Sequence, residues 1–436
     1  MPYVFINQCP IRQFSSGRIT NVLSRWSALL PGAVVLGTLA MPTFAEDQLL
    51  RQRERERVLQ QQLETHTDIR TQLPSSDNGK LPAGESPCFT IKQIYLIGEN
   101  AEQFQWALAA ANPVDDSALG QCLGVGAINL TMSRVQNAII KRGYVTTRVL
   151  AEPQDLNSGI LVLTVIPGRV GTIRFVEGTS GRANAWNAMP ISSGHLLNVR
   201  DIEQALENFK RVPTAQADIQ ITPAEAVNAT SADSDIVVAW SQQRLARLSV
   251  AIDNSGSKGT GKYQGTTALS LDDPFSLNDV FYASITRDLG GGEAGDRGSR
   301  GSTLYYSLPY GYWSLAITSS EYRYHQTVAG LNTPYVYQGQ SRSNELRLSR
   351  LLYRDAHRKS GVWSSAWTRS SENFIDDTEI ELQRRRMAGW EAGVNHREYI
   401  GVATLELNAG YRRGTGAHNS LPAPEEAVLT LRIHYQ

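Results

Sequence analysis

From Arg244 to the C-terminus, strand-like segments of about ten residues recur, and apolar and polar side chains alternate within them. The alternation is clearest in "TLELNAGYR", where Leu405 and Leu407 alternate with Glu406 and Asn408. Successive side chains of a strand point to opposite faces of its sheet, so this pattern gives one apolar and one polar face. The region carries no helical periodicity. It therefore predicts a sheet of many strands joined by turns.

The stretch "LDDPFSLNDVFY", Leu271 to Tyr282, indicates how these strands connect. Its Asp, Asn and Ser side chains can bond nearby backbone groups, and its Pro fixes one φ angle, so the centre interrupts regular structure. The flanks "TTALSL" and "DVFYASITR" are rich in β-branched and aromatic residues, which favour strands. The stretch predicts a hairpin, and hence antiparallel pairing.

A soluble β-sandwich and a transmembrane β-barrel both have one apolar and one polar face, so alternation alone does not separate them. The segment length fits the roughly 9–11 residues with which a tilted strand crosses a bilayer. Tyr and Trp gather near strand ends, as in "LYYSLPYGYW", where interfacial girdles lie. Short turns such as "PYG" alternate with long ones such as "GGGEAGDRGSRG". These features favour the barrel and leave the sandwich as the alternative.

Residues 1–45 have the layout of a secretory signal peptide. Arginines precede the apolar run "ALLPGAVVLGTLA" (residues 28–40), and small residues lead to a predicted cleavage after Ala45. The alternative is a membrane anchor, but the run is shorter than the ~20 residues of a spanning helix and Pro31 interrupts it.

Residues 46–70 consist of strong helix formers with only a thin apolar stripe. Such a helix buries little surface in a core, so we expect it in solvent or in a polar cavity. Residues 71–87, "TQLPSSDNGKLPAGESP", are rich in Pro, Gly and Ser and predict a linker.

Two small α+β modules follow, in residues 88–170 and 171–243. In the first, we expect strands at "FTIKQIYLIG", "YVTTRVLAE" and "GILVLTVIPG", with helices at 101–112 and 129–143. In the second, we expect a helix at 198–213 between strands, with Asn198 as its N-cap and Pro213 as its stop.

Cysteine usage agrees with export. The mature chain keeps only Cys88 and Cys122, and two cysteines in an exported protein predict a disulfide. Two unpaired buried thiols are the alternative.

Catalytic and nucleic-acid signals are weak. The formal net charge is zero, which gives no electrostatic argument for nucleic acid. "GTGKYQG" lacks the following helix of a phosphate-binding loop, and no histidine has metal-ligand spacing to another His or Cys. The run Arg384 to Arg386 most simply alternates between the faces of a strand, although a polyanion site is the sharper alternative. We predict no enzyme activity, no metal and no cofactor.

Taken together, these segments resemble the two-partner secretion transporters, the haemolysin secretion/activation protein family, and most closely its haemolysin and contact-dependent inhibition branch. "KRGYVTTRVL" followed by "LVLTVIPGRVGTIRF" looks like the first polypeptide-transport-associated (POTRA) domain, and "LNVRDIEQALENFKRVP" looks like the second. The segments "DNSG", "LDDPFSLNDVFY", "YSLPYGYW" and "IDDTEIELQRRRMAG" look like the barrel. Its motif residues are Asp253, Asn254, Gly256, Asp273, Pro274, Asn278 and Asp279.

The resemblance implies a mainly β protein of the outer membrane. Its fold is a transmembrane antiparallel β-barrel in residues 244–436, preceded by two periplasmic POTRA domains and a helix that plugs the pore. Its function is to recognise an exoprotein in the periplasm and secrete it through the pore. The implied partners are a secreted haemolysin, adhesin or contact-inhibition toxin, outer-membrane lipid and the barrel-assembly machinery.

We expect the exoprotein to pair with an edge strand of the first POTRA domain, by β-augmentation. The candidate edge and an adjoining apolar groove consist of Val135, Ile139, Tyr144, Val145, Thr147, Arg148 and Val149. The alternative is that these residues form only the core of the module.

Two departures from the family pattern stand out. Pro223-Ala224 replaces the usual Pro-Gly of the second POTRA domain, and no Val-Arg-Gly occurs anywhere in the chain. About ten of the family's sixteen strands can be counted, so we expect a chain truncated at its C-terminus. An inactive remnant, a passive porin and an outer-membrane hydrolase are the alternatives, although no paired nucleophile and base supports the last.

Overall fold

The computed structural model describes residues 68–71, 73, 79–225, 232–421 and 427–435. The predicted signal peptide, its cleavage site Ala45 and most of the predicted helix at 46–70 lie outside this part of the chain. Residues 68–70, the end of that predicted helix, are not helical. None of the described helices is long and apolar enough to cross a membrane.

The first α+β unit packs one helix on a three-stranded sheet. The strand order is β2-β5-β4, with β2 parallel and β4 antiparallel to β5, and β1 and β3 form a separate antiparallel pair. Phe104, Leu161, Leu163, Val135 and Ile139 are among the buried core residues. The bounds are β1 Phe89–Thr90, β2 Gln93–Gly98, β3 Cys122–Leu123, α2 Val125–Lys141, β4 Arg148–Leu150 and β5 Ile160–Ile166.

The helix predicted at 101–112 is instead two 3-10 helices, Ala101–Gln103 and Gln105–Ala111. Three of the buried side chains here, Ala101, Phe104 and Ala107, repeat every three residues, and a fourth, Ala111, follows four residues later. Three residues is the period of the 3-10 helix, so this spacing keeps all three side chains on the core side.

The strand predicted over Tyr144–Glu152 is confined to Arg148–Leu150. The preceding residues form turns, because Val145 N donates to the Gly143 carbonyl and the Tyr144 ring packs edge-on against Phe104. The helix predicted at 129–143 is present, but it begins earlier, at Val125.

The second α+β unit has the sheet order β6-β8-β7, with β6 parallel and β7 antiparallel to β8. Helix α4 begins after Asn198, whose side chain accepts from Arg200 N, so the predicted N-cap is confirmed. A short helix, α3, was not predicted. The bounds are β6 Val170–Phe175, α3 Ala185–Ala188, α4 Val199–Lys210, β7 Ala215–Pro223 and β8 Ser234–Gln242.

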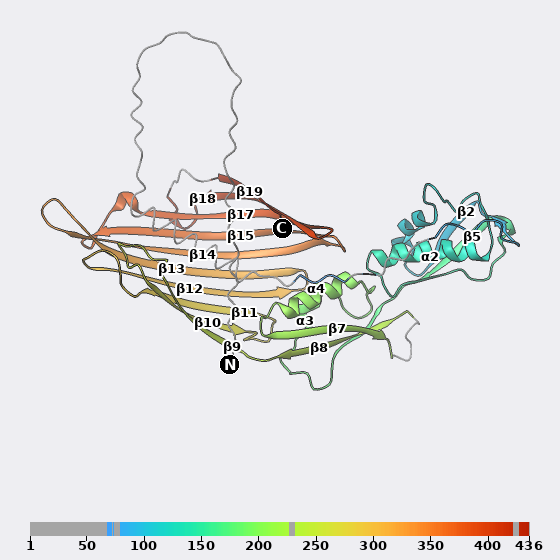
Figure 1. The fold of residues 1–436 in the computed structure, drawn as a ribbon, viewed down its shortest axis with the longest axis horizontal. Coiled ribbons are helices and arrows are strands. Elements are labelled where there is room, and N and C mark those ends of the chain that lie inside the picture. The colour runs from blue at the N-terminus through green and yellow to red at the C-terminus, as the bar shows by residue number, and fades with distance from the viewer. Residues whose placement is uncertain (1–67, 72, 74–78, 226–231, 422–426, 436) are drawn as a thin grey trace, which may run out of the picture. The chain divides into compact units, whose positions relative to one another are not determined.

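The remaining strands form one antiparallel sheet in which ten strands lie side by side in chain order (Figure 1). The short strand β16 (Thr378–Glu379) pairs with β15 outside this path. The ten are β9 Ala246–Asp253, β10 Gln264–Asp272, β11 Val280–Asp288, β12 Arg297–Tyr310, β13 Trp313–Val328, β14 Tyr335–Arg354, β15 Arg358–Ile375, β17 Arg385–Ile400, β18 Ala403–Thr415 and β19 Ala427–Tyr435.

The predicted fold class is confirmed: a mainly β chain with an antiparallel sheet of about ten strands after two α+β units. Within the described residues, β9 and β19 are the two edges of this sheet and do not pair with each other. Two-residue turns at 311–312 and 401–402 alternate along the chain with longer loops such as 289–296, as predicted.

Strand register gives the sheet two different faces. Tyr306, Ile317, Leu346 and Trp390 occupy one cross-strand row, and Ile317 and Leu346 are 45% and 47% exposed. We call this side, with its exposed aliphatic and aromatic side chains, the apolar face. The neighbouring row on the other side, the polar face, contains Arg347, Ser365, Glu391 and Arg412.

Candidate functional site

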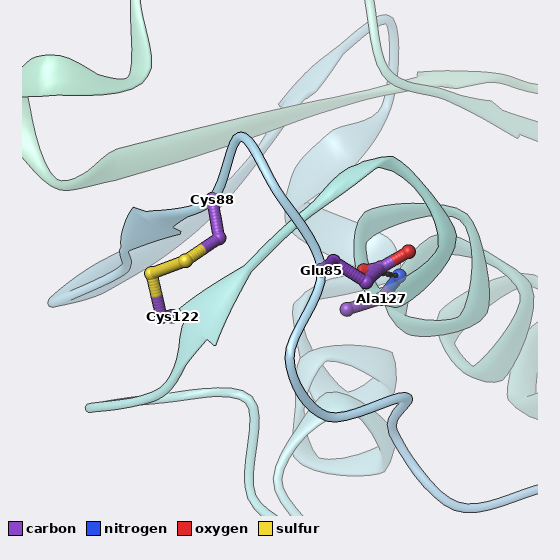
Figure 2. Close-up of a disulfide and its surroundings, with 4 residues drawn as sticks. All are labelled: Glu85, Cys88, Cys122 and Ala127. Carbon is purple, nitrogen blue, oxygen red and sulfur yellow. Dashed lines mark hydrogen bonds between the residues drawn. A yellow bond between two sulfur atoms is a disulfide. The ribbon is translucent and has the colours of Figure 1, made fainter.

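The predicted cysteine pair lies in the first α+β unit. Cys88 and Cys122 form a disulfide that joins the segment before β1 to β3 (Figure 2). Three residues before Cys88, Glu85 accepts hydrogen bonds from the backbone N–H groups of Gly126 and Ala127, at 2.9 Å each. These are first-turn amides of α2, whose own N-cap is a glycine without a side chain. The disulfide therefore holds in place a carboxylate that caps α2.

The linker predicted at 71–87 is anchored to the two α+β units. Leu81 N donates to Asp116 Oδ2, and Arg134 bonds both Asp116 and the Gly79 carbonyl. The hydrogen bond from Arg134 lowers the pKa of Asp116 below its ordinary value. Further back, Thr71 N donates to Glu203 Oε1 in α4.

Of the predicted exoprotein-binding residues, Arg148 and Val149 lie on β4, an edge strand that pairs only with β5 in the described sheet. Arg148 is exposed, and Tyr144 and Val145 are half-buried.

The predicted apolar groove needs correction. Val135 and Ile139 have no exposed surface, Thr147 has none, and Val149 is 1% exposed. Val135 and Ile139 face the sheet from α2 and fill the core of the unit. Side chains that are fully covered cannot line an open groove, so the alternative reading, module core, holds for them. What remains for pairing is the backbone edge of β4, where the Val149 N–H already donates to Gln136 Oε1 at 3.1 Å.

The turn from Asp273 to Asp279, between β10 and β11, is stabilised by its own polar side chains. Asp273 Oδ1 accepts from Asn278 N, and Asp279 Oδ1 accepts from the backbone N–H groups of Phe275 and Leu277. Asp273, Asn278 and Asp279 are buried. Asp273, Ser276 and Asn278 all have positive φ, which Asp and Asn tolerate better than most residues.

These turn residues are buried because a loop of the second α+β unit covers them. Asn278 donates from its amide to the Asn184 carbonyl and to Asn187 Oδ1, at 2.9 Å each. In the opposite direction, the side-chain amide of Asn184 donates to the Ser276 carbonyl, and that of Asn187 donates to the carbonyls of Leu277 and Pro309. We call this contact the asparagine junction.

Asn187 also reaches the next short turn of the sheet, because its carbonyl accepts from Gly311 N. Asn208 of α4 donates to the Gly311 carbonyl, and Asp201 accepts from the Tyr312 hydroxyl. Burial raises the pKa of Asp201 although the Tyr312 bond lowers it. The second unit is thus hydrogen-bonded to two turns at one end of the sheet.

Electrostatics at the asparagine junction are unusual. Burial, together with the nearby Asp279 carboxylate, raises the pKa of Asp273 from 3.8 to about 6, although the Asn278 N–H and the Arg182 guanidinium act against the rise. Arg182 bonds the Asp273 carbonyl and lies 3.7 Å from its Oδ2. The junction therefore carries a carboxyl group that titrates near neutral pH.

A second contact joins α4 to the end of β14. The Arg354 guanidinium, 2% exposed, lies 2.9 Å from Glu203 Oε2 and 3.0 Å from Glu207 Oε1. Lys359 pairs with Glu207 at 2.5 Å, and Arg200 pairs with Glu203 at 2.6 Å. These five residues form the buried ion cluster. Charges taken out of water persist only when each is paired, as they are here.

The buried ion cluster also holds the chain segment that precedes the linker. Ile69 donates its N–H to Glu207, and its carbonyl accepts from Arg354. Asp68 accepts from Lys359 and from the Tyr399 hydroxyl, and these bonds outweigh burial and lower the pKa of Asp68. Residues 68–71 therefore lie between α4 and the ends of β14, β15 and β17.

The other predicted motif residues lie at the opposite ends of these strands. Asp253 ends β9 and accepts from Ser255 N, Asn254 follows it, and Gly256 N donates to the Lys262 carbonyl. A Cβ at Gly256 would come within 1.9 Å of the Gly261 carbonyl oxygen, so the turn requires glycine there. The structure brings Asp273, Asn278 and Asp279 together with Pro274 in one turn, but not with this group.

Four residues of these contacts were not predicted from the sequence: the partners of the turn, Arg182, Asn184 and Asn187, and the cluster residue Arg354. Asn184 could have been found from the sequence, because Asn before a helix is a common N-cap. Its side chain does accept a hydrogen bond from Trp186 N. Within the described ranges, no group of three or more His, Cys, Asp or Glu side chains is placed to hold a metal ion.

Comparison with known proteins identifies this arrangement. The profile of the haemolysin secretion/activation protein family (ShlB/FhaC/HecB) matches residues 232–436, and POTRA profiles match residues 89–168 and 169–223. The solved structure of CdiB from Acinetobacter baumannii is 30% identical, with a TM-score of 0.76 over 89% of this chain and 72% of that one. The chain belongs to the haemolysin secretion/activation protein family.

Other members of the haemolysin secretion/activation protein family agree. CdiB from Escherichia coli has a TM-score of 0.75 at 25% identity, over 91% of this chain and 74% of that one. The outer membrane transporter CdiB-2 of Burkholderia pseudomallei is 33% identical, over 80% of this chain and 60% of its own length. The hemolysin transporter protein ShlB of Serratia marcescens is 24% identical, over 84% and 62%. The chain thus spans about 60% of these two curated relatives.

Family membership places the chain in the outer membrane, with the two α+β units as POTRA domains in the periplasm. The turns that the second POTRA domain contacts are therefore at the periplasmic end of the sheet. The apolar face is the lipid-facing side of such a sheet, and the polar face is the lumen side.

Proposed function

We propose that this chain is the membrane part of a two-partner secretion system, a transporter rather than an enzyme. Its POTRA domains receive an unfolded exoprotein in the periplasm, and the barrel wall guides that exoprotein outward. The cargo class is a haemolysin, an adhesin or a contact-inhibition toxin. The curated relatives named as CdiB and hemolysin transporters support this choice. For assembly we propose the barrel-assembly machinery as a partner, and lipid around the apolar face.

The observation that carries the proposal is the asparagine junction together with the buried ion cluster. Through them, the second POTRA domain is fixed to the periplasmic turns by buried side chains that bond backbone carbonyls and by paired charges. A passive porin needs no periplasmic domain fixed at its entrance. A fixed domain at the entrance can direct an extended chain to the lumen side of the sheet.

The polar face suits an extended polypeptide in transit. Its charged side chains alternate in sign, with Glu345 and Arg347 on β14 and Glu391 on β17. Arg347 and Arg412 lie 4.1 Å over the rings of Trp363 and Trp367, so their guanidinium groups are held against the wall. Such a surface offers weak polar contacts to many sequences.

We propose that the predicted helix of residues 46–70 plugs the lumen at rest. Residues 68–71, held by the buried ion cluster at the periplasmic end of the sheet, support this route. The helix would enter from the periplasmic end while its following segment stays anchored to Glu207 and Lys359.

For capture, we propose β-augmentation at an exposed POTRA edge, since backbone hydrogen bonds give affinity without demanding a sequence. The β4 edge is the predicted site, but it spans only three residues. Strand β7 of the second POTRA domain is also an edge in the described sheet, and it spans nine. A longer edge can form more backbone hydrogen bonds, so we propose β7 as a second capture site and expect it to bind the exoprotein more strongly than β4.

Two experiments test the proposal. First, co-expression with a cognate exoprotein should release that exoprotein into the medium, whereas its degradation in the periplasm would contradict transport by this chain. Second, a photo-crosslinking residue placed at Arg148 (β4) or Gln220 (β7) should capture the exoprotein, while one at the exposed loop residue Glu177 should not. Equal capture at all three positions would argue against edge pairing.

A further inference from the structure

Three arginines occupy neighbouring positions on the apolar face, at the ends of strands away from the POTRA domains. Arg287 on β11 lies directly opposite Arg300 on β12, and Arg300 lies directly opposite Arg323 on β13. All three are exposed. Because the registers of β11, β12 and β13 run without a shift, the three side chains share one face. We call Arg287, Arg300 and Arg323 the arginine row.

The arginine row belongs to the same face as the lipid-facing side chains. Along β13 towards the periplasm, Arg323 is followed on that face by Glu321 and Ser319 and then by Ile317 and Leu315, and Trp313 marks the periplasmic end. From Trp313 to Arg323 the strand advances ten residues, roughly 33 Å, which at the usual barrel tilt is about 25 Å of height. That equals the usual height of the apolar band, so the row lies where the outer leaflet's head groups begin.

The charges of the row are poorly compensated by the protein. Like charges directly opposite each other on a sheet repel, because their Cβ atoms are only about 5 Å apart. Arg323 pairs with Glu321 at 2.5 Å, and Glu321 is shared with Arg342. Among the described residues, the guanidinium groups of Arg287 and Arg300 form no ion pair or hydrogen bond. Guanidinium groups that the protein compensates so little are suited to bind an anion from outside the protein.

The space beside the row is large enough for such a group. A cavity of about 540 Å³ is lined by the arginine row together with His325, Gln338 and Gln340. His325, Gln338 and Gln340 lie on the same face as the row, on β13 and β14. Asp288 and Asp377 also border the cavity, but each accepts a hydrogen bond from the protein, from Gly290 N and from Gln338.

We propose that the arginine row binds the phosphate groups of a phosphorylated glycolipid in the outer leaflet. Arginine donates two parallel N–H bonds to a phosphate, and three arginines at neighbouring positions match a doubly phosphorylated head group. Since the apolar chains of the same lipid lie against Ile285 and Leu304 below the row, head group and chains are recognised together. The inference rests on one part of the proposed function, namely that this sheet lies in the outer membrane.

The test uses the full chain, purified in detergent, with doubly phosphorylated lipid A as the probe. In native mass spectrometry, Arg287→Gln/Arg300→Gln/Arg323→Gln should retain this lipid at least tenfold less than the wild-type protein. Lipid A without phosphates should bind weakly, and to the same extent, to the wild-type protein and to the variant with Gln at all three positions. The charge-keeping variant with Lys at all three positions should recover part of the binding, because Lys keeps the positive charge but lacks the paired N–H donors, and this partial recovery separates charge from folding.

A matched control removes three exposed positive charges from the POTRA domains, with Lys92→Gln, Lys141→Gln and Arg174→Gln. It should bind lipid A as the wild type does. Equal retention by the wild type and the arginine-row variant would overturn the proposal, as would equal retention of lipid A with and without phosphates by the wild type. If instead neither protein is found in the outer-membrane fraction of cells, the membrane location itself fails, which is a separate result.

Discussion

The side-chain amides of Asn187 and Asn278, 91 residues apart in the chain, are joined by a 2.9 Å hydrogen bond inside a fully buried contact. Asn187 comes from the second POTRA domain, and Asn278 comes from a turn of the membrane sheet. Each amide also bonds a backbone carbonyl on the other side. The orientation of the POTRA domain at the entrance therefore depends on amide groups rather than on apolar burial alone.

Replacing Asn278 with Ala should loosen this junction by about 1–3 kcal/mol, because it leaves the Asn184 carbonyl and Asn187 Oδ1 buried with one partner fewer. Hydrogen exchange of residues 182–188 should rise accordingly. Asn187→Ala should act similarly, and the double variant should cost less than the sum of the two, since both remove the same bond. Additive effects would show that the two amides act independently.

Asp273 makes the junction sensitive to pH. Because burial raises its pKa from 3.8 to about 6, the assembled junction binds a proton that the separated surfaces release. Protonated Asp273 therefore stabilises the junction fully below pH 4. This stabilisation is lost as the pH rises through 6, and the loss is roughly 3 kcal/mol at most. Exchange protection of residues 182–188, corrected for intrinsic rates, should therefore fall between pH 5 and pH 7.5.

Asp273→Asn should remove this pH dependence and give protection at pH 7.5 close to that of the wild type below pH 4, after correction for intrinsic rates. The amide oxygen can still accept from Asn278 N, while the buried charge is gone. An unchanged pH profile in this variant would assign the dependence to another group, of which the neighbouring Asp279 is the first candidate.

Arg354→Met should destabilise the contact between α4 and β14 by about 3 kcal/mol or more, because Glu203 and Glu207 keep their burial but lose a partner. Urea unfolding monitored at the POTRA domain is the measurement. The control is Arg358→Met, four residues later, whose pair with Asp355 is half-exposed at 3.2 Å and should contribute no more than about 1 kcal/mol. Similar losses in both variants would contradict the special role of the buried cluster.

In the first POTRA domain, Cys88→Ser/Cys122→Ser should lower the free energy of unfolding by about 4 kcal/mol, since the bond closes a separation of 34 residues. The two wild-type cysteines should resist alkylation until a reductant opens their disulfide. Glu85→Ala should cost about 1 kcal/mol through the lost cap on α2, whereas Glu102→Ala, on an exposed side chain, should change stability little. Labelling of both cysteines without reductant would rule out the bond.

Local sequence predicted well wherever short-range chemistry determines the structure. Asn198 caps α4 as expected, because an N-cap needs only the amide groups that follow it. Alternation in the C-terminal half predicted the sheet and its two faces, because a strand places side chains on alternate sides whatever its partners are. The turn in "LDDPFSLNDVFY" was also predictable, since Asp273 and Asp279 bond backbone groups within the turn itself.

Burial that is set by distant segments could not be predicted from local sequence. Val135 and Ile139 were expected to line a groove, but the packing of α2 on the β2-β5-β4 sheet covers them completely. The predicted helix at 101–112 became two 3-10 helices, in which the buried side chains of Ala101, Phe104 and Ala107 repeat every three residues. The boundaries predicted for the six segments remain predictions.

By itself, then, the sequence determined the periodicities, the caps, the turns and the pair of cysteines, all of which depend on residues close together in the chain or on composition. Only the tertiary structure decided that Asn278 meets Asn187, that Arg354 meets Glu203 and Glu207, and that Arg287, Arg300 and Arg323 form one row. These contacts depend on strand register and on domain packing. Both are set by the fit of whole surfaces, which no local pattern in the chain encodes.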